Sequence, residues 1–200
     1  MQVPRYLFLE QPLWAAIFWA SYIAFFLVTW WVHGRERGAA AGDRRDRGSR
    51  ALIYLLSMAG VGFAFAGPFL APDARIALPH GPVFAVAMML FWAGIVLYPW
   101  AALTLGAFFR TQVTLLEGQR LVTKGPYRLV RHPAYTAGIL VFAGIGLAMG
   151  NWLSLVGALL SVMVAYMWRI RVEEAALRER FGAEFDAHRQ RTWAVIPLIW

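Results

Sequence analysis

The chain has 200 residues, of which 60% are hydrophobic, 16% are aromatic and only 15% are charged, with a net charge of +8. A soluble domain carries about 25% charged residues, so a soluble globule or a disordered chain is excluded and an integral membrane protein is expected. The absence of cysteine excludes disulfides, cysteine-based zinc sites and cysteine nucleophiles.

Five apolar segments follow one another along the chain and predict an all-α protein with five transmembrane helices. The first segment has no charged residue over 20 positions, enough to cross about 30 Å of hydrocarbon at about 1.5 Å per residue. The last two are shorter, with 17 residues each. The segments are 13–32, 51–71, 82–109, 133–149 and 152–168.

Small residues and proline add detail to these helices. Gly60, Gly62 and Gly67 in the second segment predict close helix packing. Pro99 predicts that the third helix is tilted, kinked or projects beyond the bilayer. Only Gly150 and Asn151 separate the last two segments. Both residue types tolerate the left-handed conformation that ends a helix, so a tight helical hairpin is expected.

The basic residues predict the topology. Three connecting segments are rich in arginine, and five crossings place all three on one side: 33–50, 110–131 and 169–191. By the positive-inside rule that side is the cytoplasm, so the N-terminus lies outside and the C-terminus inside. Residues 39–50 are expected to be a solvated linker with a topological role. The abundance of Arg and Ala is typical of GC-rich bacterial genomes, which favours a bacterial inner membrane.

Residues 110–135, RTQVTLLEGQRLVTKGPYRLVRHPAY, are too polar and too rich in turn formers for a simple connector. Tyr127, Arg131, His132 and Tyr135 lie within nine residues, beside the start of the fourth helix. A helix start offers free N–H groups. This combination suits a ligand with an anionic end and an aromatic ring. The alternative is a basic interfacial loop with a histidine before proline.

Residues 169–197 are predicted to extend the fifth helix, which Gly182 could end. Glu174 and Arg178 are four residues apart and predict an exposed ion pair. Arg169 and Glu173 have the same spacing at the mouth of the bundle. There they are either charges that extend toward the interface or functional groups, because unpaired charge beside hydrocarbon is costly.

Other chemistries lack their motifs. The sequence has no phosphate loop, no HExxH, no GxSxG and no GxGxxG after a strand, and no strand is expected. The four histidines are scattered, so no metal site is indicated. On a membrane protein the positive charge marks cytoplasmic loops, and membrane lipids are the expected partners. Neither a nucleic acid nor an obligate protein partner is indicated.

Two motifs together resemble a known family. LVTKGPYRLVRHPAY (121–135), followed by RVEEAALRERFGAEF (171–185) and Pro197, is similar to the isoprenylcysteine carboxyl methyltransferases and the related phospholipid methyltransferases. The resemblance covers about residues 85–200 of a single membrane domain spanning 1–200, so that 1–84 hold the first two helices. It implies S-adenosylmethionine bound at the cytoplasmic face, between the loop before the fourth helix and the extension of the fifth.

Carried over position by position, the resemblance implies a set of site residues. Arg169 and Glu173 take the catalytic roles, and Arg169 also binds the substrate carboxylate. Departures from the family pattern are Gln119 where eukaryotic members have His, Ala137 where Gly is frequent, and Phe185 and His188 where Tyr is common. The implied cofactor contacts are Gln112, Gln119, Arg120, Leu121, Val122, Tyr127, His132, Pro133, Ala134, Tyr135 and Glu173.

The sequence does not decide which chemical class of acceptor receives the methyl group. A carboxylate needs a cation to hold it, whereas an amine or thiol needs a base such as Glu173 or His132. An arginine without a dedicated second carboxylate favours a lipophilic carboxylate, isoprenylcysteine-like or another hydrophobic small molecule. The alternatives are a phospholipid amine, a hydrophobic thiol, or a non-enzymatic membrane protein. The charge-free spans argue against a transporter, which needs charge at mid-span.

Overall fold

The computed structural model describes residues 6–35 and 43–197. Arg5, Arg37 and residues 39–42 of the predicted linker lie outside the described residues. The helices are α1 (Pro12–Gly34), α2 (Ser49–Leu70), α3 (His80–Leu105), α4 (Pro133–Ala148), α5 (Trp152–Phe181) and α6 (Ala183–Gln190). Short 3-10 helices are η1 (Leu7–Leu9), η2 (Gly106–Phe108) and η3 (Gly125–Arg128), and two short strands are β1 (Asp43–Arg44) and β2 (Thr114–Leu115).

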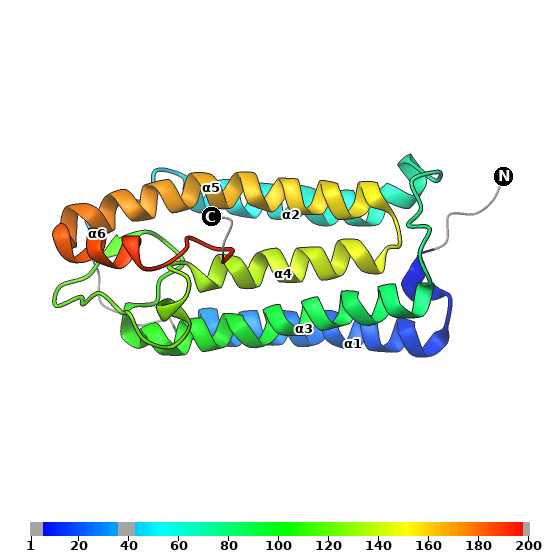
Figure 1. Cartoon of the computed structure of the whole chain (residues 1–200), viewed down its shortest axis with the longest axis horizontal. Helices are drawn as coiled ribbons and strands as arrows, with labels where there is room; N and C mark the ends of the chain where they lie inside the picture. Colours follow the sequence, from blue (N-terminus) through cyan, green and yellow to red (C-terminus); the bar gives the residue numbers. More distant parts are fainter. Residues whose placement is uncertain (1–5, 36–42, 198–200) are drawn as a thin grey trace.

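Helices α1 to α5 run along the long axis of the molecule (Figure 1). Helix α4 lies in the middle, with α2 and α5 on one side and α1 and α3 on the other. The main packing is α3 against α4 and α2 against α5. Four helices, α1, α2, α3 and α5, are long and apolar enough to cross a membrane, whereas α4 is a shorter apolar helix of 16 residues. The prediction of a bundle of apolar helices is confirmed, with four helices long enough to span a membrane and α4 shorter.

The outer helices expose apolar side chains that water would not tolerate. Only 17% of the most apolar part of α1 is buried. Its large exposed residues include Leu27, Trp30 and Trp31. Continuous apolar faces of this extent are covered by lipid in membrane proteins, and helices satisfy their backbone groups internally. The fold is therefore that of an integral membrane protein.

Glycines set the closest helix contacts. A Cβ at Gly144 would lie 2.7 Å from the carbonyl oxygen of Ala87, so α3 and α4 touch along their backbones. A Cβ at Gly67 would collide with Ser154, which brings α2 against α5. The close packing predicted at Gly67 is therefore confirmed, and a Cβ at Gly60 would likewise meet Phe142 at 2.9 Å. The prediction is wrong for Gly62, where nothing lies within 4 Å.

One end of the bundle, the turn end (residues 6–10, 71–79 and 149–152), contains the predicted hairpin between α4 and α5. Gly150 has φ of +68° and reverses the chain. The side chain of Asn151 then accepts hydrogen bonds from the backbone N–H groups of Leu153 (2.9 Å) and Ser154 (3.3 Å), which caps α5. The hairpin prediction is confirmed.

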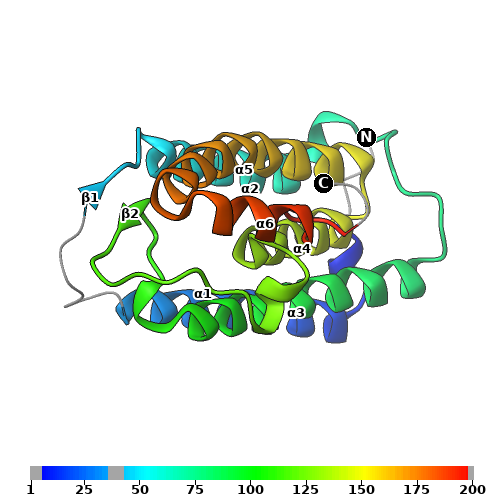
Figure 2. The ribbon, with the colours of Figure 1, turned by 60° about the vertical axis from the view of Figure 1, so that its left-hand side comes forward.

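The opposite end, the loop end (residues 43–49, 106–132 and 182–196), is more elaborate. Strands β1 and β2 pair antiparallel there, so the expectation that no strand forms is wrong (Figure 2). The chain after α6 returns to the start of α4, where the N–H groups of Arg131 and His132 donate to the carbonyls of Trp193 and Ala194 at 2.8 and 3.0 Å. Gly182, with φ of +51°, ends α5 as predicted.

Helix α5 is long enough to reach from the turn end well into the loop end. Its 30 residues span about 45 Å, beyond the roughly 30 Å of the hydrocarbon layer. Arg169 is the eighteenth residue, about 26 Å from the helix start. Its guanidinium therefore lies near the boundary between apolar bundle and polar loops.

Candidate functional site

A cavity of about 430 Å³ opens into the loop end of the bundle. Volumes of about 300–1,000 Å³ are typical of small-molecule sites. Its inner wall is apolar and includes Phe25, Val61 and Phe142 from three different helices. Its outer wall is polar and comes from the loop before α4 and the last turns of α5. The cavity thus joins an apolar chamber to a polar mouth.

The cavity collects nearly all residues that the sequence singled out. Pro133 is the exception: it is fully buried and begins α4. The remaining predicted residues all line the cavity, namely Gln112, Gln119, Arg120, Leu121, Val122, Tyr127, His132, Ala134, Tyr135, Arg169 and Glu173. They come from segments up to about 60 positions apart, which the α4–α5 hairpin brings together. Their individual roles stay predictions.

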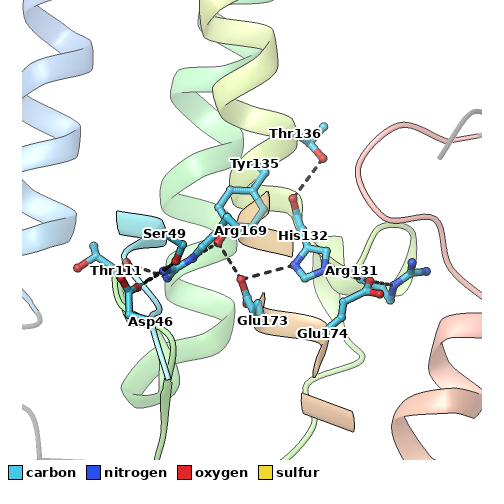
Figure 3. A network of polar contacts seen from close by, with 10 residues as sticks. All are labelled: Asp46, Ser49, Thr111, Arg131, His132, Tyr135, Thr136, Arg169, Glu173 and Glu174. Atoms are coloured by element: carbon cyan, nitrogen blue, oxygen red, sulfur yellow. Dashed lines mark hydrogen bonds and ion pairs between the residues drawn. The ribbon is translucent and has the colours of Figure 1, made fainter. Parts of the chain in front are cut away.

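Arg169 is the most enclosed charge of the site, with 2% of the residue exposed. Its Nη1 donates to the carboxylate of Asp46 and, at 2.7 Å, to the hydroxyl of Ser49 (Figure 3). Its Nη2 donates to the carbonyl of Thr111 at 2.8 Å. Its Nε donates to the hydroxyl of Tyr135 at 2.9 Å. Within the described part of the chain, these bonds use four of the five guanidinium N–H groups.

Tyr135 connects Arg169 to Glu173. The tyrosine hydroxyl accepts from Arg169 and donates to Oε2 of Glu173 at 2.7 Å. Because a guanidinium can only donate, the tyrosine proton must point toward Glu173. The ring of Tyr135 is stacked on Tyr166, with centroids 4.9 Å apart, and lies 5.6 Å from that of His132. The direction of the hydrogen bonds from Arg169 to Glu173 is therefore fixed.

Asp46 is held from several directions besides Arg169. The backbone N–H groups of Arg50 and Val113 donate to its carboxylate at 3.1 and 3.3 Å. Partial burial opposes ionisation, but the N–H group of Arg50, the charge of Arg169 and the N–H group of Val113 lower the pKa of Asp46 below its usual value. Asp46 is therefore a carboxylate at neutral pH.

This contact corrects two sequence-based inferences. The premise that Arg169 lacks a dedicated carboxylate is wrong, because Asp46 binds it. The interpretation of residues 39–50 as a purely topological linker is wrong for Asp46 and for the fully buried Ser49. The physical reason is that a buried arginine needs a counter-ion, and the chain supplies it from a distant segment.

Glu174 forms a second, partly buried ionic cluster beside the first. Its Oε1 accepts from Nε of Arg131 at 2.8 Å and lies 3.2 Å from Nε2 of His132. The predicted exposed pair of Glu174 with Arg178 is wrong, because Arg178 pairs instead with Asp186 at 2.8 Å. Glu174 points toward the start of α4 rather than along its own helix (Figure 3).

His132 and Tyr127 complete the polar wall. His132 is 4% exposed, and its Nδ1 lies 3.8 Å from Oε2 of Glu173. The hydroxyl of Tyr127 donates to the carbonyl of Ala101 at 3.4 Å. Burial, and then the nearby charge of Glu173, raise the pKa of Tyr127. Tyr127 therefore stays neutral and acts as a hydrogen-bond donor.

Sequence reasoning missed Asp46, Ser49 and Glu174. The rule that a charge near hydrocarbon is paired could have prompted a search for partners of Arg169. It could not have identified the partner, because Asp46 lies 123 positions away in the sequence. The cavity as a whole can bind a polar ligand at its mouth through hydrogen bonds and an apolar ligand group in its inner part.

Comparisons with known proteins find relatives of this chain among methyltransferases. The family model for phospholipid methyltransferases matches residues 82–184. A probable protein-S-isoprenylcysteine O-methyltransferase of Oryza sativa is 32% identical over 116 residues, which are 57% of this chain and 61% of the rice protein. The protein-S-isoprenylcysteine O-methyltransferase of Schizosaccharomyces pombe is 31% identical over 111 residues, 48% of this chain and 47% of the yeast protein. The chain thus spans about half to three fifths of these relatives.

A solved structure has a similar fold. The eukaryotic intramembrane Ras methyltransferase, an isoprenylcysteine carboxyl methyltransferase, superposes with a TM-score of 0.60 at 23% sequence identity. The match covers 73% of this chain and 52% of that chain. At this identity the likeness concerns the fold. Asp46 and Ser49 lie outside the residues matched by the family model.

Proposed function

This chain belongs to the phospholipid methyltransferase family, and from that premise we propose that it transfers a methyl group from S-adenosylmethionine to a lipophilic acceptor within the membrane. The observation that carries the proposal is the Arg169–Tyr135–Glu173 chain on the cavity wall, where the polar mouth meets the apolar chamber. One cofactor and one lipophilic substrate would need such a junction.

The polar mouth fits S-adenosylmethionine by its donor and acceptor groups. Glu173 has 32% of its side chain exposed and can accept hydrogen bonds from an ammonium or a ribose hydroxyl. The loop N–H groups at 120–122 and the side chains of Arg120 and His132 suit a carboxylate, whereas the N–H group of Gln119 donates to the carbonyl of Leu116. Tyr127 offers an aromatic face near the same opening. When bound, this cofactor supplies a methyl group on a cationic sulfur.

The chain's own residues position the reactants and exclude water. By formal charge, the two carboxylates of Asp46 and Glu173 outweigh the single guanidinium of Arg169, so this group of three favours a nearby cation. Tyr135 of α4 and Tyr166 of α5 both line the cavity, and their stacked rings add aromatic surface to its wall. For methyl transfer by in-line displacement, positioning in a water-poor cavity is the main requirement.

The acceptor is proposed to reach the apolar chamber sideways from the bilayer. Helix α1 packs against α3, whereas α2 packs against α5, although α1 and α2 follow each other in the chain. Phe26 of α1 and Met58 of α2 both line the cavity, yet they are 55% and 65% exposed. The space between α1 and α2 therefore offers a lipophilic molecule a path from hydrocarbon to the site.

A hydrophobic carboxylate, isoprenylcysteine-like or another small molecule, is the acceptor favoured by the names of the relatives. Such a nucleophile is already ionised and needs no general base. A phospholipid amine or a hydrophobic thiol is the alternative acceptor. Asp46 already neutralises the charge of Arg169, so this arginine does not depend on a substrate carboxylate for its counter-ion.

The deciding experiment uses the purified full-length chain in detergent with methyl-labelled S-adenosylmethionine. The acceptors are N-acetyl-farnesylcysteine, phosphatidylethanolamine and a long-chain alkyl thiol. We expect label in a base-labile ester with the carboxylate acceptor. Base-stable label would identify the amine or thiol instead. No transfer to any acceptor, together with no binding of S-adenosylhomocysteine, would reject the proposal. Glu184→Gln, at an exposed position of α6, is the matched control.

The proposed topology places the loop end in the cytoplasm of a bacterial cell and the N-terminus outside. A reporter that is active only in the cytoplasm should work when fused after Trp200, and a periplasmic reporter should not. The opposite result would overturn this orientation. The same experiment with fusions in the 71–79 connection should give the reverse pattern.

A further inference from the structure

We propose that Asp46 and Ser49 position Arg169, and that by holding it they keep the carboxylate of Glu173 available to the cofactor. The inference rests on the proposed function and names residues outside the part of the chain that the family model matches. Asp46 and Ser49 belong to the strap, defined here as residues 43–49, which leads into α2.

The strap is fixed across the loop end at three points. Its strand β1 pairs with β2, and the N–H group of Arg45 donates to the carbonyl of Val113 at 2.8 Å. The guanidinium of Arg45 forms an exposed ion pair with Glu179 of α5 at 2.8 Å. The third point is the contact of Asp46 with Arg169, one of the least exposed contacts of the site. The strap thus connects α2, β2 and α5.

Asp46 contacts Arg169 without itself lining the cavity. Arg169, Tyr135 and Glu173 line the cavity, whereas among the described residues Asp46 and Ser49 are not part of its wall. A ligand in the cavity would therefore face Arg169, Tyr135 and Glu173 rather than Asp46. Asp46 therefore restrains the arginine without taking the place of a ligand, which distinguishes a positioning role from that of a competing carboxylate.

Without Asp46, the nearest alternative partner for Arg169 is Glu173. The two are four residues apart on α5, a spacing at which opposite charges pair. A buried guanidinium that loses its counter-ion must find another one, because an unpaired buried charge is unstable. An Arg169–Glu173 pair would occupy the carboxylate proposed to bind the cofactor and would release the hydroxyl of Tyr135.

The test compares Asp46→Asn with the double variant Asp46→Asn/Arg169→Gln in the full-length chain. We expect Asp46→Asn to weaken S-adenosylhomocysteine binding about tenfold or more by calorimetry. The double variant removes the released arginine, so it should recover cofactor affinity while staying inactive. Asp46→Glu should restore part of the affinity, and Ser49→Ala should show a smaller loss. Glu179→Gln, which breaks only the exposed ion pair of the strap, is the matched control.

The outcomes separate this inference from the proposed function. If the wild-type chain does not bind S-adenosylhomocysteine, the proposed function fails. If it binds and Asp46→Asn binds equally well, the positioning role is rejected. A loss that the double variant does not recover would show a merely structural contact and reject it too. An Asp46→Asn enzyme with intact cofactor affinity and a lower acceptor KM would instead show a competing carboxylate. If Asp46→Asn does not fold, Ser49→Ala is compared with Ser49→Ala/Arg169→Gln: a smaller loss of cofactor affinity that the double variant recovers supports the positioning role, and no loss rejects it.

Discussion

The two ends of the bundle are held together in different ways. At the turn end, the enclosed links between connections are neutral: the N–H group of Ile76 donates to the carbonyl of Gly150 at 3.0 Å, and Nδ2 of Asn151 donates to that of Ala71 at 2.7 Å. The pair of Glu10 and His80, 2.7 Å apart, is more exposed, at 25% and 50% of the side chains. At the loop end, charged side chains with little exposure form the links: Asp46 (18%), Arg131 (10%), Arg169 (3%) and Glu174 (17%).

This difference implies that the turn end contributes mainly to the stability of the fold, whereas the loop end mainly fixes the positions of functional side chains. Neutral hydrogen bonds and a helix cap contribute to stability at little desolvation cost. Buried ion pairs contribute little net stability, because desolvation offsets the attraction, but they define positions sharply. The turn end therefore keeps the helices in register, whereas the loop end holds functional groups in one arrangement. Substitutions at the two ends should accordingly change different quantities.

The largest effect is expected at Arg169. Arg169→Ala should lower turnover by about 10²–10³-fold, the scale of one preorganised electrostatic group. Cofactor affinity should persist, because Glu173 remains. Arg169→Lys should rescue poorly, since an ammonium cannot make the planar contacts of a guanidinium. Turnover and S-adenosylhomocysteine calorimetry would measure both quantities. A fully active Arg169→Ala enzyme would show that the loop end does not depend on this charge.

Next in size are the residues proposed to contact the cofactor. Tyr135→Ala, His132→Ala and Glu173→Ala should each weaken S-adenosylhomocysteine binding about tenfold or more, which corresponds to about 1.4 kcal/mol. Each removes a group from the polar mouth of the cavity. Calorimetry on folded variants tests this directly. Wild-type affinity in all three would contradict the assignment of the mouth to the cofactor.

A moderate effect on stability alone is expected at the turn end. Asn151→Ala removes the cap of α5 and the bond to Ala71, and should lower the free energy of unfolding by about 1–2 kcal/mol. The activity of the folded fraction should be unchanged. Thermal unfolding in detergent, with turnover per folded molecule, measures both. If Asn151→Ala lowered turnover without lowering stability, the proposed difference between the two ends would be wrong.

The smallest effect concerns pH at the loop end. Burial, then the nearby positive groups Arg131 and His132, lower the pKa of His188 below the ordinary histidine value of about 6.5. The unfolded chain thus gains a proton as pH falls below about 6.5, before the folded chain does. The free energy of unfolding should therefore fall as pH drops from about 7 to 5, and His188→Gln should make this fall less steep. Identical slopes for both proteins would rule out this contribution.

Local sequence patterns anticipated much of the fold. The predicted segments 13–32 and 51–71 agree with α1 and α2 to within two residues at each end. An apolar run determines a helix locally, and Gly150 and Gly182 end helices through their own backbone conformation. Such local effects can be predicted from the sequence. The family resemblance likewise assigned the site residues to two motifs. These motifs lie close together in the structure because α4 and α5 form one hairpin.

Only the tertiary structure decided which charges meet. The sequence determined that Arg169 lies near the edge of an apolar helix and needs a partner. It left open whether that partner is Glu173, one turn away, or a residue elsewhere. The fold selected Asp46 because α2 packs on α5, and because β1 pairs with β2 and holds the strap beside the guanidinium. Hydrophobic periodicity specifies which face of a helix is buried, but the pairing of buried charges depends on distances between segments that only packing fixes.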